Sequence, residues 1–252
     1  MRRLRFPVGR PLGIQLWIHI SWFGVLGLVI WSVAAGFAEA LPELPAAERF
    51  AMAVVTGMGF FTCLAIHEIA HAVVARRFGV EVLGITLFML GGVAEIRGEL
   101  PSPGSEFAVA LAGPATSVAI GSVLAVAAAL VGDGGWRGPE GVLLTLAVVN
   151  LGVAVFNLVP GLPLDGGRIL RAAIWKRTSS FTHATRVAAF GGRLVAATLV
   201  SVGIVSTATG RIIGVWYVVM GAFVWLLARA SGRATAPVTG GALALNGEGE
   251  AA

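Results

Sequence analysis

Six apolar runs separated by short polar connections constrain this chain more than any other feature of its sequence. They cover residues 14–37, 50–74, 106–131, 142–159, 183–207 and 211–227, and each is about as long as a bilayer-crossing helix. The composition agrees, because 57% of the residues are hydrophobic and only 12% are charged, against about a quarter in soluble domains. We therefore expect an all-α integral membrane protein with about six transmembrane helices.

Arginines mark one side of the membrane. Four lie within residues 1–10, Arg76 and Arg77 follow the second apolar run, and several basic residues lie within 168–177 after the fourth. Because basic loops favour the cytoplasm, we expect a multi-pass protein of a cell membrane with both termini cytoplasmic. Only one basic residue is a lysine, a coding bias consistent with a bacterial plasma membrane. The net charge of +5 thus reflects topology in the lipid bilayer, and no nucleic-acid partner is expected.

The chain divides into a membrane core and a short tail. Residues 1–230 hold all six apolar runs, and the first run does not have the short core of a signal peptide, so we expect it to be retained. Residues 231–252 are rich in glycine, alanine, threonine and glutamate. This composition is too poor in large apolar groups to fold, so we expect a disordered C-terminal tail.

The second apolar run contains the pattern His67-Glu68-Ile-Ala-His71. A helical spacing of four places both imidazoles on one face, as ligands of a single zinc ion require. In this motif the carboxylate is the general base for a water that the zinc acidifies. Ionisable groups inside a span are rare and usually functional. The sequence therefore predicts one Zn²⁺ per chain near the cytoplasmic end of this helix. In a soluble chain, the alternative would be two histidines on the surface of a helix.

Three other potential metal ligands have simpler interpretations. Cys63 lies one turn before His67, so a fourth thiolate ligand is conceivable, but a small apolar filler is the simpler interpretation. His19 and His183 fall near the ends of spans, where an interfacial role is more common than a metal site.

Residues 80–97 differ from the rest of the apolar sequence. They are rich in β-branched and aromatic residues, with Gly91 and Gly92 as a turn. This pattern predicts a short membrane-associated β-hairpin after the second span. An exposed edge of the hairpin would be able to pair with an unwound substrate strand, and a plain connecting loop is the alternative.

The fourth apolar run carries Asn150 and Asn157 and then breaks into two prolines and three glycines around Asp165. At membrane depth, irregular backbone is tolerated where it is buried in protein or lines a wet cavity. Asp165 is therefore the natural third ligand, because a catalytic zinc takes three protein ligands and water. The alternative is that Asp165 only caps a helix over residues 166–176.

Several motifs together resemble one family. They are His67-Glu68-Ile-Ala-His71, Gly91-Gly92-Val-Ala-Glu-Ile, Ala112-Gly113-Pro114-Ala115, Phe156-Asn157-Leu-Val-Pro160 and Pro163-Leu-Asp165-Gly166-Gly167-Arg168. In this combination the chain resembles the site-2 protease family of intramembrane zinc metalloproteases, the M50 peptidases. The resemblance covers about residues 10–230.

The resemblance implies a zinc metalloendopeptidase that cleaves a membrane-protein substrate in or next to its transmembrane segment, as a step in regulated intramembrane proteolysis. It assigns His67, His71 and Asp165 to the metal and Glu68 to the general base. It also assigns Asn157 to substrate binding, although an asparagine in a span can serve helix packing alone.

Some features depart from the family, and one alternative function stays open. The PDZ and CBS domains of many relatives have no room here, so we expect a compact member, and Ser117 stands where several branches have asparagine. The alternative is a zinc-binding membrane protein without hydrolysis, either a transporter or an inactive client-binding homologue. A transporter would distribute polar residues along a path, whereas the polar groups here gather at one depth. Substrate identity and oligomeric state are not predicted.

Overall fold

The computed structural model describes residues 4–88, 91–97, 100–132, 134, 137–211 and 213–234. Within these ranges the helices are α1 Ser21–Ala40, α2 Ala46–Arg77, α3 Pro103–Gly132, α4 Arg137–Asn157, α5 Asp165–Thr178, α6 Phe181–Ala208 and α7 Ile213–Ala234. All except α5 are long and apolar enough to cross a membrane, which confirms the expected six spans. The disordered tail was expected from residue 231, but residues 231–234 belong to α7, and the rest of the expected tail, from residue 235, lies outside the described residues.

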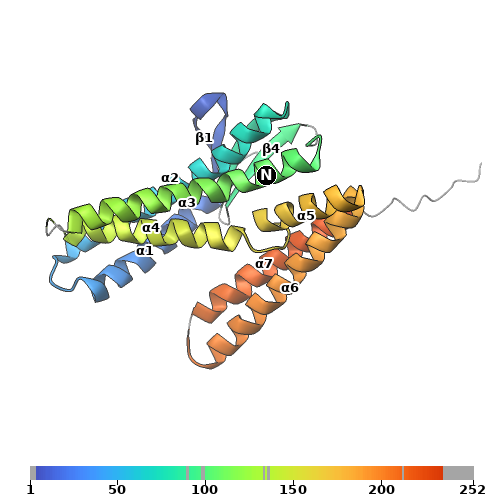
Figure 1. Ribbon diagram of the computed structural model, residues 1–252. Coiled ribbons are helices and arrows are strands. Elements are labelled where there is room, and N and C mark those ends of the chain that lie inside the picture. Colours follow the sequence, from blue (N-terminus) through green and yellow to red (C-terminus); the bar gives the residue numbers. More distant parts are fainter. Residues whose placement is uncertain are drawn as a thin grey trace, which may run out of the picture.

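The helices form two groups (Figure 1). Helix α3 packs against α2 and α4, and α1 packs against α2. Helices α6 and α7 form a hairpin that is joined to the first group through α5. The buried positions of α6 are small, and they include Ala188, Gly192 and Ala196. Small residues let helix backbones approach closely where no hydrophobic effect drives association.

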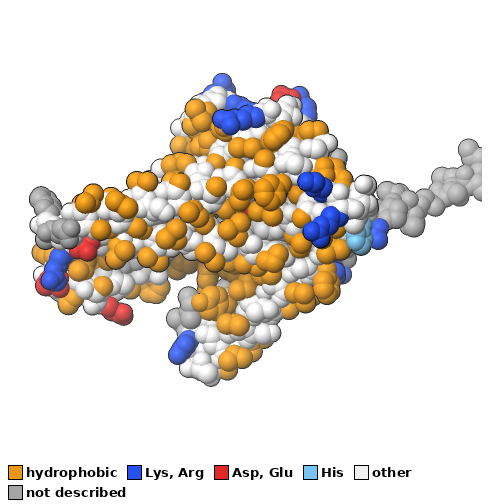
Figure 2. Space-filling model, viewed as in Figure 1, with side chains coloured by type: hydrophobic (Ala, Val, Ile, Leu, Met, Phe, Trp, Pro, Cys, Tyr) orange, Lys and Arg blue, Asp and Glu red, His pale blue; other side chains and the backbone are white. Residues whose placement is uncertain are grey.

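The outward surface is apolar along the helices. Large side chains such as Val123, Leu130 and Val155 are exposed there. Figure 2 shows apolar side chains along the helices and most charged side chains near their ends. This distribution suits helices whose middle portions contact lipid tails.

A four-stranded sheet accompanies the helices. Its strands are β1 Arg5–Gly9, β2 Leu16–His19, β3 Glu81–Phe88 and β4 Gly91–Arg97, in the order β1-β2-β3-β4. Strands β3 and β4 form the predicted hairpin, and β2 pairs with β3 in parallel. The first span therefore begins at Ser21 and not near residue 14. The backbone groups of the apolar residues 16–18 form the hydrogen bonds of a β-ladder with residues 85–87, and not those of a helix.

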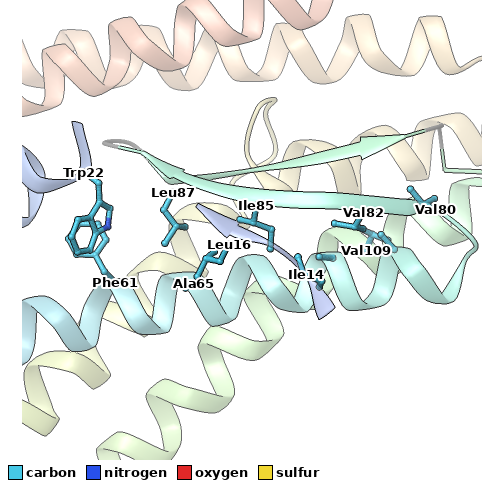
Figure 3. Close-up of a cluster of buried hydrophobic side chains, with 12 residues drawn as sticks. Ile14, Leu16, Trp22, Phe61, Ala65, Val80, Val82, Ile85, Leu87 and Val109 are labelled. Carbon is cyan, nitrogen blue, oxygen red and sulfur yellow. The ribbon is translucent and has the colours of Figure 1, made fainter. Parts of the chain in front are cut away.

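The inner face of the sheet packs on α2 (Figure 3). Side chains of β2 and β3, including Leu16, Ile85 and Leu87, point toward Phe61 and Ala65 of the helix. All five are buried. This cluster fixes the β3–β4 hairpin along the part of α2 that carries the histidine motif.

A polar row crosses the outer face of the sheet. The Arg5 guanidinium of β1 forms an ion pair with Glu95 of β4 and donates a hydrogen bond of 3.3 Å to Thr86 of β3. It also lies 4.9 Å from the ring centre of Trp17. The outermost strands are therefore linked, which holds β4, the edge strand nearest the motif, in place.

Candidate metal centre

Three buried side chains from two helices converge on one point. His67 and His71 come from α2, and Asp165 is the first residue of α5. The Asp165 Oδ2 atom lies 3.2 Å from each imidazole Nε2 atom, and the two Nε2 atoms are also 3.2 Å apart. The exposed fraction is 2% for His67, 6% for His71 and 7% for Asp165. The structure thus brings together all three ligands predicted from the sequence.

This triangle fits a tetrahedral zinc site. Zinc binds nitrogen and oxygen at about 2.0–2.1 Å, which makes the edge of a tetrahedron about 3.3 Å. The three measured edges match that length. Gly113 of α3 leaves the necessary space, because a Cβ atom there would lie 2.5 Å from His67 Nε2 and would also collide with His71 Nε2. The donor set and the space around it therefore fit the metal.

The connection between α4 and α5 delivers Asp165 to this point. The Leu162 amide in the connection donates a hydrogen bond of 3.0 Å to the Ala188 carbonyl of α6. The irregular backbone at this depth therefore finds a hydrogen-bond partner within the protein. The N-cap residue of α5 is Leu164, and no side chain caps the helix. Helix capping, the alternative considered for Asp165, is not what its carboxylate does here.

Glu68 lies between the histidines in sequence and faces β4. The Gly92 amide donates a hydrogen bond to its carboxylate. The contact is close, because a Cβ atom on Gly92 would lie 2.5 Å from Glu68 Cγ. The hairpin thus holds the proposed general base, and only glycine permits this approach.

A cavity of about 940 Å³ extends from the three candidate metal ligands between the two groups of helices. Its walls are mainly apolar residues of α1, α2, α4 and α7, such as Val29, Phe60, Val153 and Phe223. Gly92 and other residues of the hairpin line it as well. In Figure 2 the surface is hollowed between the α6–α7 hairpin and the arm formed by α1 and α4.

Asn157 lines the same cavity near the end of α4. Its side-chain amide donates a hydrogen bond of 3.1 Å to the Val153 carbonyl of its own helix, and the side chain is half-buried. Asn150, in contrast, is buried, and its side-chain amide donates a hydrogen bond to the Leu146 carbonyl of the same helix. Of the two asparagines, Asn157 is the one positioned to meet a ligand in the cavity.

The other candidate ligands lie apart from this centre. Among the described histidines, cysteines and acidic residues, Cys63, His19 and His183 do not belong to the group of potential ligands. His19 Nδ1 is 2.9 Å from the Ser21 hydroxyl at the start of α1, and His183 is exposed at the start of α6. These positions agree with the non-metal interpretations.

Sequence reasoning missed the partners of the outer imidazole nitrogens. His71 Nδ1 lies 2.6 Å from the Val109 carbonyl, and His67 Nδ1 lies 2.9 Å from the Ser117 hydroxyl. Both partners come from α3. The spacing of Val109, Gly113 and Ser117 by four residues was the available signal, because it matches the spacing of the two histidines.

The sequence of the protein matches a known family over more than half of its length. The family model for peptidase family M50 matches residues 55–135 and 135–202. This chain belongs to peptidase family M50. The matched residues include the histidine motif and Asp165, so the metal-ligand triangle lies within the M50 region.

Individual M50 relatives extend this comparison. Rip3 of Mycobacterium tuberculosis is 38% identical over 227 residues, which cover 88% of this chain and 57% of Rip3. The protein sll0528 of Synechocystis is 37% identical over 178 residues, which cover 69% of this chain and 45% of the relative. This chain thus spans about half the length of these two curated relatives.

The fold is also similar to that of a solved site-2 protease. The site-2 protease from Methanocaldococcus jannaschii superposes with a TM-score of 0.62 at 26% identity, over 91% of this chain and 95% of that one. The M50 membership and this likeness identify the six spans and the small sheet as a site-2 protease fold.

Proposed function

We propose that this chain is an intramembrane zinc metalloendopeptidase that hydrolyses a peptide bond in or next to the transmembrane segment of a membrane protein. The proposal is carried by the 3.2 Å triangle of His67, His71 and Asp165, which lies in the same cavity as Glu68. Membership in peptidase family M50 supports the same reaction.

In this proposal His67, His71 and Asp165 hold one Zn²⁺ per chain. Bound zinc supplies Lewis-acid polarisation of a carbonyl and acidifies water. Two neutral imidazoles and one carboxylate leave a net positive charge on the bound ion, which suits stabilisation of a developing oxyanion. The burial of all three ligands keeps competing water away from the site.

Glu68 is the proton carrier of the reaction. Its carboxylate takes a proton from the attacking water and delivers it to the amine leaving group. The Gly92 amide orients one part of the carboxylate, and the rest remains available to the substrate side. Asn157, which lines the cavity, holds the substrate backbone or the developing oxyanion by hydrogen bonds.

The substrate is an unwound stretch of membrane protein. A helix hides its peptide bonds, so the segment has to become extended before cleavage. Strand β4 is the edge of the sheet, and Gly92 and Ala94 of this strand line the cavity. An edge strand can pair with an extended peptide through main-chain hydrogen bonds. Cleavage of this kind is suited to regulated intramembrane proteolysis in the plasma membrane of a bacterium.

Zinc content and proteolysis, measured on the same detergent-purified samples, test the proposal. Wild type should hold about one zinc per chain and cleave a membrane-tethered reporter with a glycine-rich span, because zinc needs all three ligands and glycine eases unwinding. Asp165→Ala should lose both zinc and cleavage. Glu68→Gln should keep zinc and lose cleavage, whereas Glu43→Gln, which alters an exposed turn, should change neither.

Two results would contradict the proposal. Cleavage at the wild-type rate by Glu68→Gln would remove the general base from the mechanism. Tight zinc binding by wild type without cleavage of reporters with differing spans would favour the second candidate function. That candidate is a zinc-binding membrane protein without hydrolysis. The one observation that favours it is the complete triangle of His67, His71 and Asp165.

A further inference from the structure

Helix α3 presents three residues to the histidine face of α2. Val109, Gly113 and Ser117 are spaced by four, so they share one face of α3. Val109 meets His71, Ser117 meets His67, and Gly113 lies against both Nε2 atoms. Helix α3 thus offers a partner for each outer nitrogen and an open space for the inner ones.

The two outer partners differ in chemistry. The Val109 carbonyl can only accept, so the proton of His71 sits on Nδ1 and its Nε2 lone pair faces Asp165. The Ser117 hydroxyl can donate or accept. If it donated to His67 Nδ1, the Nε2 atom would carry the proton and would be unable to bind a metal. The role of Ser117 therefore decides whether His67 is a competent ligand.

We propose that Ser117 is a positioning residue of the metal centre. Its hydroxyl oxygen accepts a hydrogen bond of 2.9 Å from the Nδ1–H group of His67, which fixes the ring and leaves Nε2 unprotonated toward Asp165 and His71. Ser117 is fully buried at 0% exposure, so water does not replace the hydroxyl when it is removed. This inference rests on the proposed zinc site and adds a residue that sets its affinity.

Zinc affinity, measured by competition with a chromophoric chelator on the detergent-purified full chain, tests the proposal without any substrate. Ser117→Thr and Ser117→Val have the same shape and differ only in the hydroxyl, so packing effects cancel between them. Loss of such an outer partner weakens metal binding about 10–100-fold. We expect Ser117→Val to bind zinc weaker than Ser117→Thr by that factor, and Ser117→Ala to be weak as well.

Thr116 provides the matched control. Thr116 precedes Ser117 in α3, and its hydroxyl donates a hydrogen bond of 2.8 Å to the Ala112 carbonyl of the same helix. Thr116→Ala should therefore keep wild-type zinc affinity. Cobalt substitution gives a second signal, because the d–d absorption of the ion reports the geometry of the ligands and should change in Ser117→Val but not in Thr116→Ala.

The outcomes separate this inference from the proposed function. Equal zinc affinities of Ser117→Thr and Ser117→Val would overturn the role of the hydroxyl, while wild-type zinc binding and proteolysis would leave the proposed function intact. Absence of zinc from wild type would overturn both. A weaker Ser117→Val with an unchanged Thr116→Ala is the result that supports the inference.

Discussion

At the scale of single residues, Gly113 shows how closely α3 approaches the histidines. A Cβ atom at this position would lie 2.5 Å from His67 Nε2, closer than real Cβ atoms approach a nitrogen. It would also collide with His71 Nε2. A methyl group here would fill the space that the ligand triangle leaves for an ion.

Gly113→Ala should abolish zinc binding without unfolding α3, because alanine favours a helix over glycine by about 1 kcal/mol. Zinc content per chain, with far-ultraviolet circular dichroism on the same sample, measures both effects. Gly36→Ala in α1 is the control, since a Cβ atom there meets nothing within 4 Å. Wild-type zinc content in Gly113→Ala would contradict this view of the site.

The residues of the centre were predictable to different degrees. The motif over residues 67–71 is local, so its spacing alone brings both imidazoles to one face. Asp165 was found because prolines and glycines around it break a span. The contacts of Val109 and Ser117 escaped prediction because the spacing by four residues shows only that they share a face of α3, and the register between α2 and α3 decides what that face meets.

At the scale of elements, β4 acts on the site through its backbone. Gly92 bonds the Glu68 carboxylate and leaves no room for a side chain. The ion pair between Arg5 and Glu95 ties this strand to the far edge of the sheet. The sheet therefore positions Glu68, the proposed general base, as well as forming an edge.

Gly92→Ala should lower kcat about 100-fold, because a displacement of about 1 Å at a catalytic group can cost that much. Zinc content should stay at the wild-type level, since Glu68 is not one of the three proposed ligands. Gly9→Ala in β1, whose Cβ would meet nothing within 4 Å, should retain full activity. Single-turnover cleavage assays measure the effect, and an unchanged kcat in Gly92→Ala would refute it.

A buried ion pair joins α3 to α5. The Arg171 guanidinium donates to Glu106 Oε1 by two hydrogen bonds, one of them 2.7 Å long from Nε. Glu106 is 1% exposed, and its Oε2 atom has no hydrogen-bond partner among the described residues. The pair anchors the helix that carries Asp165.

Arg171→Met should destabilise the protein, because removing one partner of a buried pair costs about 3–5 kcal/mol. Thermal unfolding in detergent should show a clearly lower Tm. The double variant Arg171→Met with Glu106→Leu should recover part of the loss, since neither charge then remains buried alone. A single variant as stable as wild type would show that the pair contributes nothing to the docking of α5.

The sheet illustrates what element prediction can reach. The β3–β4 hairpin was predictable from the β-branched and aromatic residues of this segment, but the expected turn at Gly91 and Gly92 was wrong, because both glycines belong to β4 and pair with Phe88 and Leu87 of β3. Strands β1 and β2 were not predictable, since Pro7 and Gly9 disfavour a strand and the parallel pairing joins residues 16–18 to 85–87. Such pairing is decided by packing on α2 and leaves no trace in the periodicity of either segment.

At the scale of the whole molecule, the two ends of the helix bundle differ in charge. At one end Glu43, between α1 and α2, forms an exposed ion pair with Arg137, the first residue of α4. At the other end Arg76 of α2 bonds the Leu12 and Gly13 carbonyls, and α5 ends with Lys176 and Arg177. The second end carries the basic residues that favour the cytoplasm.

Cysteine labelling tests this orientation. In a Cys63→Ser background, Glu43→Cys should react with a membrane-impermeant maleimide in intact cells, because it lies in the connection expected outside. Arg177→Cys should react only after the cells are opened. The reverse pattern would mean that the membrane orientation is inverted.

The separation of the metal ligands along the chain has a consequence during synthesis. His71 and Asp165 are 94 residues apart. Ribosomes add about 5–20 residues per second, so α2 is made roughly 5–20 s before its third ligand exists. The nascent chain therefore enters the membrane before all three side chains of the candidate metal centre exist, and under the proposed function it gains the capacity to cut only when α5 docks, late in biogenesis.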